Sequence, residues 1–124
     1  MTQRQIEDGI GELCERLEDL TTDYAQALSE AAEAEASYRL GYYKSLLTTK
    51  ANGIEQASND DGQKPRRKAT DTEAAAWATV DNEDGFRRYK ITAAHAEALK
   101  QSLFVQRTRL DALRTLAANV RAQT

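Results

Sequence analysis

The feature of this chain that most restricts its fold is a pair of ladders in which mostly apolar residues recur at alternating intervals of four and three. The first ladder consists of Ile6, Ile10, Leu13, Leu17, Leu20, Tyr24, Ala27, Ala31, Ala34 and Tyr38. The second ladder consists of Tyr89, Thr92, Ala96, Leu99, Leu103, Gln106, Leu110, Leu113, Ala117 and Val120. On a helix this spacing forms one stripe along the axis, and the stripe needs a partner helix to cover it. The ladders therefore predict two long helices that pack on each other.

The segment between the ladders predicts a loop. Residues 56–69 are rich in Asn, Asp, Ser and Gly and contain the only proline, Pro65, which are the residue types that favour turns. We expect a helix over about 3–55, a loop over 56–69 and a helix over about 70–121. Two arms of similar length around one loop are typical of an antiparallel hairpin. The predicted fold is all-α, an elongated coiled-coil-like hairpin, with a single domain over 1–124.

Two short motifs indicate where the helices begin. Thr2 is a candidate N-cap ahead of the first ladder. Thr70 and Glu73 have the spacing of a capping box, in which each residue's side chain accepts a hydrogen bond from the backbone of the other. The second arm is therefore expected to start at about Thr70.

The middle of the second arm allows two interpretations. Trp77 and Val80 lie on a different stripe from the ladder that starts at Tyr89. Either the helix is interrupted near Gly85, or one long helix changes its buried face there. The sequence leaves both open.

Charge is distributed unevenly along the chain. Residues 1–35 carry two basic and ten acidic side chains, whereas residues 85–124 carry eight basic and two acidic ones. A hairpin pairs these two arms, with acidic residues such as Glu12 and Asp19 opposite Arg109, so internal complementarity explains the asymmetry. A seam between only two helices buries little area against the entropy of ordering both arms. We therefore expect self-association into a helical bundle.

Nothing in the sequence indicates secretion, a membrane span or an enzyme. The only cysteine, Cys14, excludes an internal disulfide framework and fits a reducing compartment, and no apolar run is long enough to cross a bilayer. The only histidine, His95, has no partner at catalytic spacing, and Cys14 has acidic neighbours that disfavour a thiolate. Metal-ligand and phosphate-loop motifs are also missing. We expect a cytoplasmic, non-enzymatic protein without catalytic residues, metal, cofactor or small-molecule substrate.

Two basic runs are candidates for contact with single-stranded DNA. The first lies in the predicted loop, and the second interleaves cations with aromatic residues, as single-strand binders do. A short basic run beside acidic residues is also common in ordinary solvated loops. The candidate phosphate-binding residues are Arg66, Arg67, Arg87, Arg88 and Lys90.

Aromatic residues gather in the half of the hairpin next to the loop. Tyr, Trp and Arg are the types enriched in protein-interface hot spots. The same residues could instead fill the seam between the helices, and the sequence does not separate these interpretations. The candidate interface residues are Tyr38, Tyr42, Tyr43, Trp77, Phe86 and Tyr89.

The run from Lys68 to Trp77, the following acidic bridge, Tyr89, and the ending Leu110–Arg121 resemble small helical proteins of tailed bacteriophages. Those proteins tend to be encoded among recombination and replication genes. The likeness covers mainly residues 66–121, with a weaker likeness over 36–44. It implies an accessory role in phage DNA metabolism, within the cytoplasm of the host cell, and it carries over no catalytic residue.

These observations lead to one functional expectation and two alternatives. The expectation is a non-enzymatic phage accessory protein in DNA recombination or replication that binds a partner protein or single-stranded DNA. One alternative is a protein-only module that inhibits or caps a host or phage protein. The other is a structural coiled-coil component of the virion.

Overall fold

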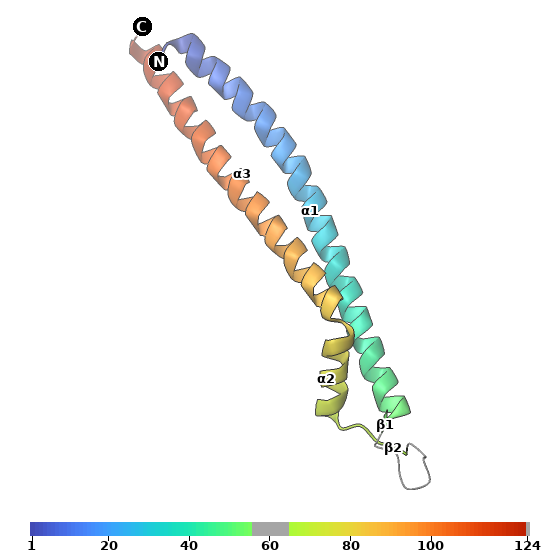
Figure 1. The fold of residues 1–124 in the computed structure, drawn as a ribbon. Coiled ribbons are helices and arrows are strands. Elements are labelled where there is room, and N and C mark those ends of the chain that lie inside the picture. The colour runs from blue at the N-terminus through green and yellow to red at the C-terminus, as the bar shows by residue number, and fades with distance from the viewer. Residues whose placement is uncertain (56–64, 124) are drawn as a thin grey trace. The chain divides into compact units, whose positions relative to one another are not determined.

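The computed structural model describes residues 1–55 and 65–123, and helices make up 89% of this part. The elements are α1 (Gln3–Asn52), β1 (Ile54–Glu55), β2 (Arg66–Arg67), α2 (Asp71–Asp81) and α3 (Glu83–Gln123) (Figure 1). The predicted all-α hairpin is confirmed. The chain divides into a terminal unit, Met1–Ala31 with Thr92–Thr124, and a central unit, Ala32–Ile91. Both α1 and α3 contribute residues to each unit.

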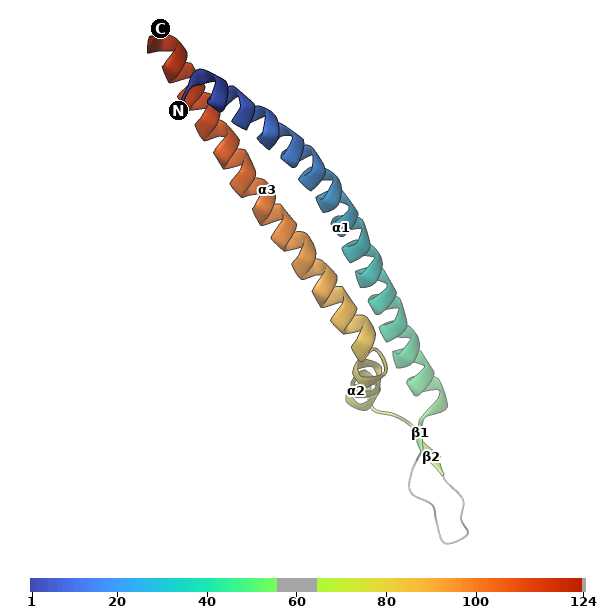
Figure 2. The same cartoon turned by 45° about the horizontal axis from the view of Figure 1, so that its top comes forward.

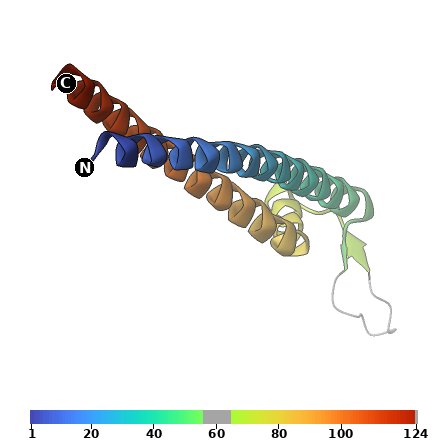
Figure 3. The ribbon, with the colours of Figure 1, turned by 90° about the horizontal axis from the view of Figure 1, so that it is seen from above.

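In the terminal unit, α1 and α3 lie side by side and antiparallel, and both chain ends lie at the same end of the unit (Figures 1, 2 and 3). Every ladder position in this unit is buried or half-buried, as the intervals of four and three predict. The best-covered side chains are those of Ile6, Ala27, Ala96, Leu103, Leu110 and Ala117. The seam is close at Gly9, where an added Cβ would come 3.3 Å from Leu113 Cδ1. The periodicity therefore identified the packed faces of both helices.

The predicted N-cap of α1 is confirmed. The backbone N–H of Gln5 donates to Thr2 Oγ1 at 3.2 Å, and the backbone N–H of Thr2 donates to Gln5 Oε1 at 2.9 Å. These reciprocal bonds form a capping box and satisfy two backbone donors that a helix start leaves without partners.

In the central unit, Gly53 follows the last residue of α1 and terminates the helix. This residue has φ 71°, which glycine adopts without steric cost, and its N–H donates to Thr49 O at 2.8 Å. The helix thus stops at Asn52, slightly before the predicted end near Glu55. Residues 54–55 then pair antiparallel with residues 66–67, in the register Ile54 with Arg67 (Figure 2). This strand pairing was not predicted from the sequence. Residues 56–64 of the predicted loop lie outside the described residues.

The helix of the second arm is interrupted, at Asn82. The side-chain Nδ2 of Asn82 donates to Ala78 O at 2.8 Å and to Ser45 Oγ on α1 at 2.9 Å. Its Oδ1 lies against Gly41, where an added Cβ would come within 2.4 Å. Gly85 is helical, inside the first turn of α3. Of the two interpretations that the sequence left open, the interruption is therefore the one that the structure has, and it lies at a residue whose side chain binds across the hairpin.

Candidate protein-binding site

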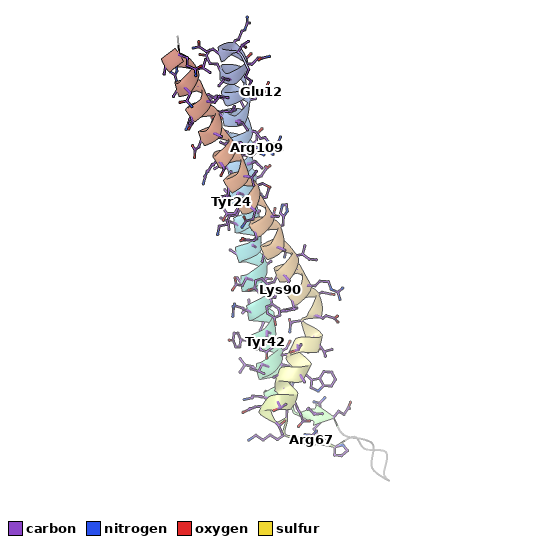
Figure 4. All side chains as sticks on the ribbon, turned by 90° about the vertical axis from the view of Figure 1, so that its left-hand side faces the viewer. Glu12, Tyr24, Tyr42, Arg67, Lys90 and Arg109 are labelled. Carbon is purple, nitrogen blue, oxygen red and sulfur yellow. The ribbon has the colours of Figure 1, made fainter. Side chains whose placement is uncertain are left out.

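Four aromatic rings of the central unit form a cluster within the hairpin. The Tyr38 ring centroid lies 5.4 Å from that of Phe86, 5.9 Å from that of Tyr89 and 6.2 Å from that of Tyr42. Lys90 Nζ lies 5.1 Å from the Tyr89 centroid and 5.4 Å from the Phe86 centroid, which are cation–π distances (Figure 4 labels Tyr42 and Lys90). Tyr38, Tyr42 and Tyr89 are half-buried. Much of the predicted aromatic surface therefore packs inside the hairpin.

Trp77 is directed outward, and 48% of its surface is exposed. It lines a hollow of about 370 Å³ together with Ile54, Ala76, Val80 and Glu73. The aliphatic parts of this lining come from β1 and α2, and Val80 is 66% exposed. An indole ring and branched aliphatic side chains that meet around a hollow form a surface that would gain free energy on being covered.

Cations lie beside this hollow. A neighbouring hollow shares Ile54 and Trp77 and adds Arg66 and Glu55 to its lining. A third hollow shares Arg66 with Lys50, Arg67 and Lys68. We call the surface formed by Ile54, Ala76, Trp77 and Val80 the tryptophan surface, and Lys50, Arg66, Arg67 and Lys68 its basic rim.

The rim side chains also hold the local fold. Arg66 Nη1 donates to the carbonyl oxygens of Asn52 at 3.0 Å and Gly53 at 3.3 Å, which are carbonyls at the end of α1. Lys50 forms an ion pair of 2.5 Å with Asp71 in the first turn of α2. Arg67 binds both carboxylate oxygens of Glu73, one of them at 2.7 Å from Nη1. These bonds tie the two ends of the hairpin turn together.

Glu73 is the most strongly perturbed carboxyl group of the described chain. The hydrogen bonds from Arg67 lower the pKa of Glu73 from its ordinary 4.5 to about 2, and the N–H and hydroxyl of Thr70 hold the carboxylate as well. The backbone N–H of Glu73 in turn donates to Thr70 Oγ1 at 3.1 Å, so the predicted capping box is confirmed. The Glu73 carboxylate, bound in this way, stabilises the N-terminus of α2.

The hydrogen bonds to the Glu73 carboxylate make the stability of the hairpin depend on pH. Because the pKa of Glu73 is lower in the folded chain, its carboxylate stabilises the fold fully above about pH 4.5, and this contribution is lost as the pH falls toward 2. Acid titration followed by circular dichroism should show wild-type stability falling in that window more steeply than the stability of Glu73→Gln. The difference isolates Glu73 from Asp71, whose pKa Lys50 also lowers. Equal slopes for the two proteins would contradict the assignment.

In the second basic run, residues 87–90, Arg87 and Lys90 interact with side chains close to them in the sequence. Arg87 Nη2 lies 3.0 Å from Glu83 Oε1, one helical turn away. Lys90 lies over the rings of Phe86 and Tyr89. Arg88 is exposed. The structure therefore brings Arg66 and Arg67 together at the basic rim, and Arg87, Arg88 and Lys90 together at the start of α3.

Three residues of this site, Arg66, Arg67 and Trp77, were predicted from the sequence as binding residues. The others were not: Ile54, Ala76, Val80, Lys50 and Lys68. Val80 had a signal, since it follows Trp77 by three positions on a stripe that the main ladder does not use. No sequence pattern pointed to Ile54, because its position depends on the turn at Gly53 and on pairing with Arg67.

Within residues 1–55 and 65–123, no group of three or more His, Cys, Asp and Glu side chains is arranged to hold a metal ion. No helix of the described chain is long and apolar enough to cross a membrane. Comparisons with protein-family models, with curated proteins and with solved structures find no match to this chain.

Proposed function

We propose that this protein is a non-enzymatic adaptor that binds a partner protein through the tryptophan surface. The observation that carries the proposal is an apolar hollow around a half-exposed Trp77, bordered by the basic rim. Tryptophan and arginine are the residues that most often dominate binding energy at protein interfaces. The resemblance of residues 66–121 to small helical phage proteins supports the further proposal that this adaptor acts in phage DNA recombination or replication.

The lining specifies the chemistry of the partner. The hollow itself is apolar, apart from Glu73, whose charge is paired with Arg67. An apolar side chain of the partner would fill it, and carboxylates next to that side chain would meet the basic rim. We therefore propose that the bound segment is acidic and carries at least one large apolar residue.

Single-stranded DNA is the second candidate ligand. It is favoured by the exposed turn that carries Phe86, Arg87 and Arg88, in which a 44% exposed ring adjoins two guanidinium groups. The cations of both surfaces already have partners in the chain, so they do not separate the two candidates. The tryptophan surface ranks ahead of this turn because Trp77 and Val80 line an apolar hollow that a side chain of the partner can fill.

Fluorescence anisotropy tests the proposal with a labelled peptide that carries leucine and phenylalanine next to four aspartates. The full chain should bind this peptide, and a peptide with lysines in place of the aspartates should not bind. Trp77→Ala should weaken binding by about 30-fold, which is the loss of a hot-spot side chain worth about 2 kcal/mol. Phe104→Ala is the matched control, since Phe104 is 67% exposed and lies in the terminal unit.

Two results would overturn the proposal. One is binding of the acidic peptide that Trp77→Ala leaves unchanged, and the other is no binding at low salt. A labelled single-stranded oligonucleotide in the same assay examines the second candidate. Salt-sensitive binding of the oligonucleotide that Arg87→Ala combined with Arg88→Ala weakens would establish DNA as the ligand instead.

A further inference from the structure

The terminal unit contains a buried polar atom without a partner. Gln106 occupies a core position of the second ladder and is 7% exposed. Within the described chain, its Oε1 is buried and accepts no hydrogen bond. Buried acceptors in native proteins are almost always satisfied by protein or ordered water, so this one calls for a donor that the described residues do not supply.

Gln106 lines a groove on one side of the terminal unit. The groove has a volume of about 570 Å³, and its charged lining consists of Glu12, Glu15, Arg16 and Asp19 from α1 and Arg109 from α3 (Figure 4 labels Glu12 and Arg109). An apolar hollow of about 360 Å³ continues it along Leu13, Ala112, Leu113 and Leu116. The same side of the unit thus presents an apolar strip beside an orphaned amide and groups of both charges.

The charges on this side are arranged as complements without being joined. Sequence reasoning placed the acidic residues of α1 opposite Arg109, and the structure places Glu12, Glu15 and Asp19 around the same groove as Arg109. Among the described residues, however, no ion pair joins Arg109 to any of these carboxylates. Both charged sets therefore remain available to a second molecule that carries the same pattern.

We propose that this side of the terminal unit binds a second copy of the same chain. A two-fold axis parallel to the helices places α1 of each copy over α3 of the other, which opposes the acidic residues of one copy to Arg109 of its partner. A two-fold axis across the helices would place α1 over α1 and bring its three carboxylates, with Arg16 as the one cation beside them in the groove lining, against their own copies. The charge pattern selects the first arrangement, an antiparallel four-helix bundle.

The first arrangement also provides for Gln106. The two copies of this residue lie at the same height beside the axis, where an amide can both donate and accept. Because Oε1 is enclosed in the single chain, the Gln106 amide has to turn toward the axis on association, and Nε2 of one Gln106 then donates to Oε1 of the other. A polar residue at a core position then specifies the register and the number of helices, as polar core residues do in coiled coils.

The mass of the full chain in solution tests this interface, measured by light scattering across roughly 1–100 μM. The wild-type protein should have twice the mass of one chain. Leu116→Glu should shift it to the single-chain mass, because a carboxylate would enter the apolar strip beside acidic residues of the partner. Arg109→Glu should do the same by opposing like charges. Phe104→Glu is the matched control, because Phe104 lies on α3 and lines neither part of the groove.

Circular dichroism on each variant separates loss of dimer from loss of fold. Helical monomers of Leu116→Glu and Arg109→Glu, together with a dimeric Phe104→Glu, support the interface. A wild-type chain that stays single at the highest concentration overturns it. So does a dimer that only Phe104→Glu dissociates, since the second copy would then bind the opposite face of α3.

Discussion

Gly41→Ala is expected to destabilise the hairpin by about 1–3 kcal/mol, although alanine is the better helix former. The added Cβ would come within 2.4 Å of Asn82 Oδ1, and Asn82 is anchored by its bonds to Ser45 and Ala78. Either the amide must leave these partners or the two helices must separate. Urea denaturation followed by circular dichroism measures the free energy of unfolding.

The chain offers two controls for this substitution. Gly11 lies in the same helix with nothing within 4 Å of its added Cβ, so Gly11→Ala should stabilise by about 1 kcal/mol. In an Asn82→Ala background the obstacle is removed, and Gly41→Ala should change sign and become stabilising. A destabilisation that persists in that background would show that Asn82 is not the reason for glycine at this position.

The second large effect is expected at Tyr38. Its ring contacts those of Tyr42, Phe86 and Tyr89, so Tyr38→Ala removes three aromatic pairs at once. We expect a loss of about 3 kcal/mol in the free energy of unfolding, whereas Tyr38→Phe should cost less than about 0.5 kcal/mol because the ring remains.

The contrast with Trp77 connects this stability measurement to function. Trp77 is half-exposed and packs in none of the aromatic pairs, so Trp77→Ala should leave the free energy of unfolding nearly unchanged while it weakens peptide binding. If Tyr38→Ala proved harmless and Trp77→Ala unfolded the chain, the division between packing and binding residues would be reversed.

Much of the fold could be predicted from the sequence because its signals are local. The ladders identified the buried stripe of each helix, down to the polar position of Gln106. The Thr70–Glu73 capping box identified the start of α2 because its two hydrogen bonds join residues only three apart. Such signals need no knowledge of the partner helix.

The candidate site was less accessible because residues distant in sequence create it. Tyr38 and Trp77 are both large aromatic residues on helices, and composition does not separate them. Tyr38 lies on the face of α1 that meets Phe86, whereas Trp77 lies on an exposed face of α2 beside Ile54. The choice between core and interface therefore depends on which face of each helix the hairpin covers.

The sequence by itself determined that this protein is a helical hairpin with an acidic and a basic arm, since the period of apolar residues and the count of charges are properties of the chain alone. Only the tertiary structure decided that the second arm is interrupted at Asn82 and that a tryptophan surface lies next to a basic rim. It also decided that Gln106 Oε1 accepts no hydrogen bond from the residues that the structure describes. These features depend on contacts between residues that are far apart in the sequence, and such residues come close to each other only when the helices have packed.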